Sequence, residues 1–159
     1  MSRVPIAAEI AIRPAAASEA RRLSALALRS KAHWGYSIEF IEACRRELTY
    51  DCEYLLRNTV FVAEIDTGIV GFYALDRVSE TEAELTAMFV EPEHIGRRIG
   101  RALITHAKET ARGQGIEAII IQGDPNAAAF YQAAGGVRCG MRPSGSIPGR
   151  DLPLFRILL

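Results

Sequence analysis

The chain has 159 residues, of which 49% are hydrophobic and 24% are charged. This is the composition of an ordinary globular protein that can bury a core without a metal or a disulfide. Lys and Arg together number 19, as do Asp and Glu, so the basic excess typical of nucleic-acid-binding domains is missing. The sequence has no apolar run near the roughly 18 residues of a membrane span, and no apolar signal-peptide core at residues 1–12. We therefore expect one cytoplasmic domain over residues 1–159, with no nucleic-acid or membrane partner.

The first half of the chain alternates strand and helix patterns. Residues 9–13 alternate apolar and polar positions and predict a strand, and apolar residues recur at helical spacing over 18–31, with Ser18 as the expected N-cap. Ser37 can cap a second helix over 38–48. A short helical turn is expected at 51–57. Two strands follow at 59–65 and 69–76, joined by a hairpin turn at 66–68.

The second half predicts how the strands are connected. A strand at 82–90 is followed, after Pro92, by a loop with Gly96 and Gly100 and a helix that ends at Arg112. A short apolar strand, a helix and two strands follow, at 118–122, 126–134, 138–142 and 152–158. Strands joined by short turns are antiparallel, whereas a strand–helix–strand step needs a parallel pair. The sequence therefore predicts an α/β fold with a central mixed sheet of about seven strands and helices on both faces.

The residue types that bind metals are few and scattered. The chain has three cysteines and three histidines: Cys44, Cys52, Cys139, His33, His94 and His106. None of these has the spacing of a metal site or a redox motif, so we predict no metal centre. We expect His106 to be structural, on a buried helix face, and His94 to be exposed in a loop.

The segment 90–103 (VEPEHIGRRIGRAL) carries the strongest chemical signal. A strand leads into a loop with two glycines, and the loop opens a helix. Glycines let backbone N–H groups approach an anion, and the helix N-terminus adds positive dipole. Arg97, Arg98 and Arg101 add positive charge. The segment therefore predicts a pyrophosphate-binding site, although it lacks the spacing of a P-loop or of a dinucleotide-binding fingerprint.

This segment resembles the coenzyme A-binding motif of the GNAT family (Gcn5-related N-acetyltransferases). The family pattern is Val-x-Pro followed by Arg/Gln-x-x-Gly-x-Gly/Ala, and this chain departs from it at Ile95 and Arg98. A second segment, 123–136 (GDPNAAAFYQAAGG), resembles the family's Asn-x-x-Ala-x-x-Phe-Tyr element. Segments 13–18 (RPAAAS) and 64–71 (EIDTGIVG) resemble its opening strand and central hairpin. The likeness is collinear over nearly the whole chain.

The resemblance implies a site for acetyl-CoA. The loop residues Ile95, Gly96, Arg97, Arg98, Ile99, Gly100 and Arg101 would bind its pyrophosphate. Backbone N–H groups of Met88, Phe89 and Val90 would bind the acetyl carbonyl and the pantetheine arm. Asn126 would contact that arm, or serve only as a helix cap. Tyr131 would protonate the departing thiolate, or serve only as a core aromatic.

The resemblance also aligns Glu84 with the family's glutamate base. Strand alternation places Glu82, Glu84, Thr86 and Met88 on one face. Because Glu84 lies about 13 Å along the strand from Met88, we expect it to act through water. The alternatives are that no acidic base exists, or that the proton leaves by solvent, His33 or Glu82.

The segment between the first two helices is where the family builds its acceptor pocket. It contains Lys31, His33, Trp34 and Tyr36, which could equally form a packing plug. The resemblance implies transfer of an acetyl group from acetyl-CoA to a primary amine, by direct attack in a ternary complex. The acceptor would be a small molecule or a peptide. The alternative is a non-catalytic domain that binds a CoA ester or a partner. The last strand could pair across a homodimer.

Overall fold

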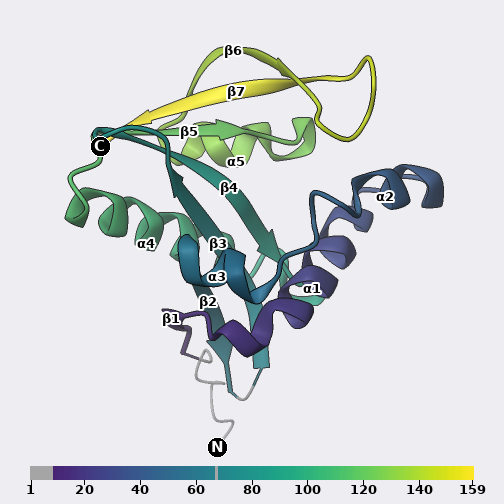
Figure 1. Cartoon of the computed structure of the whole chain (residues 1–159), viewed down its shortest axis with the longest axis horizontal. Helices are drawn as coiled ribbons and strands as arrows, with labels where there is room; N and C mark the ends of the chain where they lie inside the picture. Colours follow the sequence, from purple (N-terminus) through teal and green to yellow (C-terminus); the bar gives the residue numbers. More distant parts are fainter. Residues whose placement is uncertain (1–8, 67) are drawn as a thin grey trace, which may run out of the picture.

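A computed structural model describes residues 9–66 and 68–159. Most of the segment searched for a signal peptide, and Thr67 in the predicted hairpin turn, lie outside these residues. Within the described residues, seven strands form one sheet in the order β1-β2-β3-β4-β5-β7-β6, seen in Figure 1. None of the helices in this part of the chain is long and apolar enough to cross a membrane.

The strands match the predicted ones closely. They are β1 (Ala11–Pro14), β2 (Thr59–Ile65), β3 (Gly68–Arg77), β4 (Glu82–Val90), β5 (Ala118–Gln122), β6 (Val137–Pro143) and β7 (Asp151–Leu158). Neighbouring strands are antiparallel except for β4 and β5, which are parallel. The predicted mixed sheet is confirmed.

The helices also follow the sequence pattern, except that the helix predicted over 38–48 ends at Cys44. They are α1 (Ala20–Ala32), α2 (Ile38–Cys44), α3 (Cys52–Arg57), α4 (Ile99–Gly113) and α5 (Ala128–Ala133). Ser37 caps α2 as predicted, by accepting a hydrogen bond from the N–H of Phe40 at 3.1 Å. The predicted cap at Ser18 is wrong, because a 3₁₀ turn over Ala17–Glu19 precedes α1. There the carboxylate of Glu19 accepts the N–H of Ala16 at 2.7 Å.

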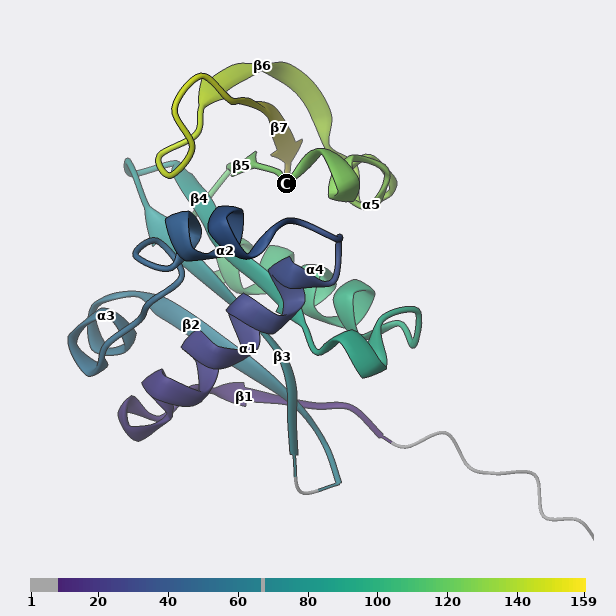
Figure 2. The ribbon, with the colours of Figure 1, turned by 90° about the vertical axis from the view of Figure 1, so that its right-hand side faces the viewer.

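Helices cover both faces of the sheet and enclose two cores. On one face, α4 buries an apolar row that includes Leu103 and Ala107, and α5 adds Tyr131. On the other face, α1 buries Leu23 and Leu26, and α2 and α3 extend that core. Figure 2 shows β5, β6, β7 and α5 together at one end of the molecule, and β1, β2 and α1 toward the other.

Strand β4 contains a bulge at Thr86. In its ladder with β3, Leu85 pairs with Leu75 and Ala87 pairs with Ala74, so Thr86 has no partner. A bulge inserts one residue and leaves it unpaired, and the side-chain alternation is reversed beyond it.

The bulge decides which side chains of β4 share a face. Leu85, before the bulge, packs in the core beneath α4, and Met88, beyond the bulge, packs against the same core. Phe89 packs against the opposite core. Glu84, next to Leu85, therefore lies on the opposite face from Met88. The prediction that these two residues share a face is wrong, since it assumed unbroken alternation.

Strands β4 and β5 separate soon after they pair. Their parallel ladder covers only three positions, from Glu82–Ala118 to Glu84–Ile120. Figure 1 shows the remainder of β4 running away from β5. Among the residues that the structure describes, the edge of β4 that faces β5 therefore has no strand partner beyond Glu84.

An ion-pair network fastens β1 to the start of α1. Arg13 donates to both carboxylate oxygens of Glu19 at 2.8 Å, and to Glu64 on β2 at 2.6 Å. The hydrogen bonds from Arg13 lower the pKa of Glu19 to about 2, from 4.5. A carboxyl group whose pKa is lower in the folded state stabilises the fold above its unfolded pKa, and this stabilisation is lost as the pH falls through the folded pKa.

Glu19→Gln should therefore destabilise the protein at neutral pH. We expect a loss of about 1 kcal/mol in the free energy of unfolding at pH 7, the size typical of a partly exposed ion pair. The difference from wild type should shrink between about pH 4.5 and pH 2. Urea unfolding at several pH values measures it, with the exposed Glu80→Gln as control. A difference that does not change with pH would contradict this account.

Candidate active site

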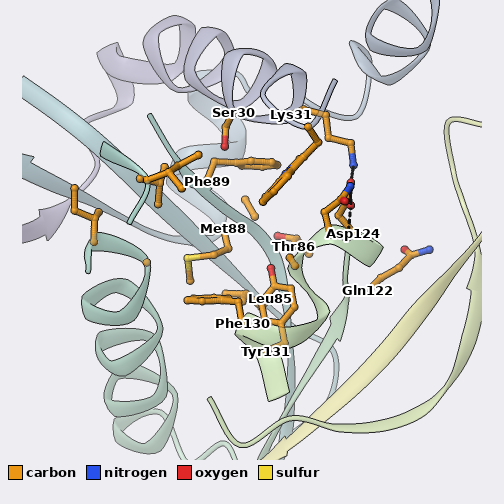
Figure 3. A pocket seen from close by; sticks show the side chains of 18 of the residues that line it. Ser30, Lys31, Leu85, Thr86, Met88, Phe89, Gln122, Asp124, Phe130 and Tyr131 are labelled. Atoms are coloured by element: carbon orange, nitrogen blue, oxygen red, sulfur yellow. Dashed lines mark hydrogen bonds and ion pairs between the residues drawn. The ribbon is translucent and has the colours of Figure 1, made fainter. Parts of the chain in front are cut away.

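A cavity of about 660 Å³ lies where β4 separates from β5. Its walls come from β4, the end of α1, the start of α4 and the segment after β5, as Figure 3 shows in part. Most of the predicted site residues line it: Lys31, Trp34, Glu84, Met88, Phe89, Val90, Ile95, Gly96, Arg98, Ile99, Gly100, Arg101, Asn126 and Tyr131. The predicted residues His33, Tyr36 and Arg97 lie outside its lining.

The open edge of β4 presents backbone N–H groups to this cavity. The N–H of Glu91 donates to the carbonyl of Val70 on β3 at 2.8 Å. Because backbone groups in an antiparallel pair alternate between the two edges of a strand, the N–H of Phe89 also faces β3. The N–H groups of Met88 and Val90 face the other edge, toward the cavity. Of the three predicted donors, two are therefore available to a bound carbonyl.

The N-terminus of α4 forms a second donor group in the same cavity. The first hydrogen bond of α4 runs from the N–H of Ala102 to the carbonyl of Arg98, at 3.0 Å. The N–H groups of Ile99, Gly100 and Arg101 precede it and have no acceptor within the helix. Together with the helix dipole, they suit a phosphate group. Arg98 and Arg101 add positive charge to the cavity wall.

The backbone explains two positions in this loop. Arg98 caps α4 with φ of 66°, in the left-handed region that favours glycine. The GNAT motif has glycine here, so this chain keeps the conformation at a cost of about 1 kcal/mol and gains a guanidinium. At Gly100, an added Cβ would lie 3.1 Å from the ring of Phe130. Glycine at position 100 therefore allows α4 to approach α5 closely.

Tyr131 closes the cavity from the α5 side. Its ring packs against Phe130 and Phe155, at centroid distances of 5.3 and 5.9 Å. Its hydroxyl points into the cavity, as Figure 3 shows. Burial raises the pKa of Tyr131 above its ordinary value. The hydroxyl therefore keeps its proton at neutral pH and can donate it to a hydrogen-bond acceptor in the cavity.

The two glutamates considered as bases are both held by arginines. The carboxylate of Glu84 accepts a hydrogen bond from Arg142 on β6. Glu82 pairs with Arg156 on β7 at 3.0 Å. One oxygen of each carboxylate is therefore engaged at the end of the sheet where β4 and β5 are still paired.

Asp124 ties the segment between α1 and α2 to the rest of the site. Its carboxylate accepts hydrogen bonds from Lys31 at 2.6 Å, from the Tyr36 hydroxyl at 2.8 Å, and from the N–H of Asn126 at 2.8 Å. Arg150, from the β6–β7 loop, donates to the Tyr36 hydroxyl at 2.8 Å. Burial would raise the pKa of Asp124, but the hydrogen bonds from Lys31, Asn126 and Tyr36 outweigh it and lower that pKa.

The sequence analysis missed two members of this cluster, Asp124 and Arg150. Asp124 stands inside the segment that resembles the family motif, directly before Pro125 and Asn126, but the roles expected there fell on Asn126 and Tyr131. Arg150 lies in a Ser/Gly/Pro loop where no periodicity indicates its direction. Only the tertiary contact with Tyr36 brings it into the site.

The aromatic residues and histidines fall into different environments. Trp34 lines the cavity at its mouth and is 43% exposed. His33 packs edge-on against Trp34, with a centroid distance of 5.2 Å. His106 contacts the hydroxyl of Tyr73 at 2.7 Å, which fits the structural role predicted for it. His94 is half-buried and lines the cavity, so the prediction that it is exposed is wrong.

The chain belongs to the GNAT acetyltransferase family. The family model described as an acetyltransferase (GNAT) domain matches residues 57–135, which include β4, the glycine loop and α5. Within residues 9–66 and 68–159, no three His, Cys, Asp or Glu side chains are placed to hold a metal ion.

Solved structures share the fold. The PaiA N-acetyltransferase of Thermoplasma acidophilum, solved with coenzyme A, is 22% identical, with a TM-score of 0.77 over 95% of this chain and 99% of that one. A Gcn5-related N-acetyltransferase of Rhodopseudomonas palustris is 22% identical, with a TM-score of 0.79 over 99% and 100%. A GNAT acetyltransferase of Elizabethkingia anophelis, solved with acetyl-CoA, is 19% identical, with a TM-score of 0.68 over 94% and 98%. A search of curated proteins found no significant match.

Arg98→Glu should weaken coenzyme A binding. The change places a negative charge beside the N-terminus of α4 and keeps a non-glycine residue at a position with positive φ. We expect the Kd for coenzyme A to rise at least tenfold, which is about 1.4 kcal/mol. Isothermal titration calorimetry at low salt measures it.

Arg97→Glu is the matched control for this experiment. It changes the net charge equally, but Arg97 lies outside the cavity lining. We expect less than a threefold change in Kd. Equal losses in both variants would mean that only the net charge of the loop matters.

Proposed function

We propose that this protein is an N-acetyltransferase that transfers an acetyl group from acetyl-CoA to a primary amine, with residues 1–159 acting as one domain. The observation that carries the proposal is the continuity of the cavity. The N–H groups at the start of α4, which suit a diphosphate, share one cavity with the free N–H groups of Met88 and Val90, which suit a thioester carbonyl. Membership of the GNAT family supports this assignment. Coenzyme A and acetyl-CoA in two neighbours of the same fold support it further.

The proposed mechanism gives each group on the cavity wall one role. Arg98, Arg101 and the first N–H groups of α4 bind the pyrophosphate. Asn126 contacts the pantetheine arm. The N–H groups of Met88 and Val90 stabilise the negative charge that develops on the carbonyl oxygen. Binding the amine beside the thioester supplies the proximity for direct attack.

The acceptor is proposed to enter between α1 and the β6–β7 loop. Trp34 and Lys31 line this part of the cavity, and Asp124 with Tyr36 fixes the surrounding backbone. A small-molecule amine or a peptide amine fits this opening. Glu84 stays the base predicted from the sequence, and Arg142 engages one of its two carboxylate oxygens. The cytoplasmic location and the homodimer also stay predictions.

An acceptor screen tests the function. Thermal shift with acetyl-CoA measures binding, and thiol release measures turnover with an alkylamine, an amino acid, an aminoglycoside, a peptide with a free N-terminus, or an N-blocked lysine peptide. We expect a shift, together with thiol release for at least one amine. A shift without thiol release for any amine would favour the alternative, a non-catalytic domain that binds CoA esters.

Tyr131→Phe should slow turnover without weakening coenzyme binding. The thiolate that leaves when the C–S bond breaks needs a proton, and the Tyr131 hydroxyl is the proposed donor. We expect kcat to fall on the order of 10²-fold, with an unchanged Kd for coenzyme A. Tyr50→Phe removes another buried phenol hydroxyl, outside the cavity lining, and should leave kcat unchanged. Wild-type kcat in Tyr131→Phe would reassign Tyr131 to packing.

A further inference from the structure

The bulge residue Thr86 links the cavity to the half-buried carboxylate of Asp76. The Thr86 side chain lines the cavity, where Figure 3 labels it. Its hydroxyl lies 2.9 Å from the hydroxyl of Tyr54 on α3 and donates to the carboxylate of Asp76 on β3 at 3.3 Å. The Tyr54 hydroxyl donates to the same oxygen of Asp76 at 3.3 Å. Three side chains from three elements therefore form one network that reaches the cavity at Thr86.

Thr86 lies closer to the proposed carbonyl site than Glu84 does. Thr86 is two positions from Met88 and Glu84 is four positions from it, which is about 7 and 13 Å along an extended strand. The shorter separation needs fewer water molecules to connect an attacking amine with the Thr86 hydroxyl. The longer distance needs a chain of water molecules.

Asp76 differs from the two glutamates in the groups that contact it. Arginines hold Glu82 and Glu84, whereas Asp76 makes no ion pair within the described residues and accepts its hydrogen bonds from the hydroxyls of Thr86 and Tyr54. Burial raises the pKa of Asp76 above its ordinary value. Asp76 therefore takes up a proton more readily than an exposed aspartate does.

The charged and titratable groups around Asp76 come from three directions. Glu84 faces it from β4, as the partner of Asp76 in the ladder, and Arg142 from β6 binds Glu84. Tyr54 contacts it from α3, and Tyr50 lies in the segment before α3. On the β2 side of Asp76, Thr59 pairs with Leu75, the residue that precedes Asp76. Glu84 repels a negative charge on Asp76 and so favours its protonated form.

We propose that Asp76 accepts the proton of the acceptor ammonium, relayed through the hydroxyl of Thr86. This inference rests on the proposed function. One ammonium proton passes to the Thr86 oxygen, directly or through one water, as the Thr86 proton passes to Asp76. The freed amine then forms the C–N bond, the C–S bond breaks, and the sulfur takes the proton of Tyr131. The second nitrogen proton restores Tyr131 through solvent, and Asp76 returns its proton to solvent.

The test is a pH profile of kcat/KM for wild type and Asp76→Asn, with the amine that releases most thiol in the acceptor screen. We expect a deficit on the order of 10²-fold in Asp76→Asn, well below the pKa of the amine. The deficit should shrink as the pH approaches that pKa, because free amine then needs no base. The Kd for coenzyme A should not change.

A pair of variants at Thr86 keeps the test decisive if Asp76→Asn folds poorly. Thr86→Val removes the hydroxyl at nearly constant volume and should reproduce the pH-dependent deficit. Thr86→Ser keeps the hydroxyl and should restore the rate to within about threefold of wild type, a recovery that packing alone does not predict. The pH profile of Glu84→Gln, measured in parallel, shows whether the carboxylate that binds Arg142 acts as the base instead of Asp76.

The outcomes separate the relay from the function. If wild type is active but the ratio of its kcat/KM to that of Asp76→Asn or Thr86→Val does not change with pH, the relay is overturned and the proposed function is not. A pH-dependent deficit found only in Glu84→Gln also overturns it. A wild type that releases no thiol with any amine in the screen overturns the proposed function and, with it, the relay.

Discussion

The separation of β4 from β5 is the constraint on which the rest of the site depends. A strand inside a sheet normally pairs its backbone groups on both edges, and unpaired N–H groups away from water are costly. Here the parallel ladder ends after three positions, and the bulge at Thr86 bends β4 at that point. The N–H groups of Met88 and Val90 therefore need another acceptor. A thioester carbonyl is such an acceptor, so the break in the sheet is also the proposed reaction site.

The two cores hold this break open from opposite faces. Beneath α4, Ile99 and Leu103 are almost fully buried, which fixes where the helix begins and thus where its N-terminal N–H groups point. On the other face, Leu23 and Leu26 fix α1 against the sheet. Because interiors are close-packed, neither helix can shift without opening a void. The Asp124 cluster then joins the end of α1 to the segment that carries Asn126.

Local pattern was enough to predict the elements but not the side-chain geometry of the site. The β-branched runs at 59–65 and 69–76, and the glycine loop before α4, identified their elements correctly because these signals depend on neighbouring residues. Alternation placed Glu84 and Met88 on one face, and the bulge separated them. A bulge has no reliable signature in one strand, because it is a mismatch between two strands.

The sequence by itself determined the order of the elements, the mixed sheet and the position of the glycine loop before α4. These follow from periodicity, glycine placement and the rule that a strand–helix–strand step gives a parallel pair. Only the tertiary structure decided which polar and charged side chains meet. Glu84 meets Arg142 across 58 positions of sequence, Lys31 meets Asp124 across 93, and Tyr54 meets Asp76 across 22. Such pairings depend on how the faces of distant elements align, and that alignment is fixed by packing rather than by local sequence.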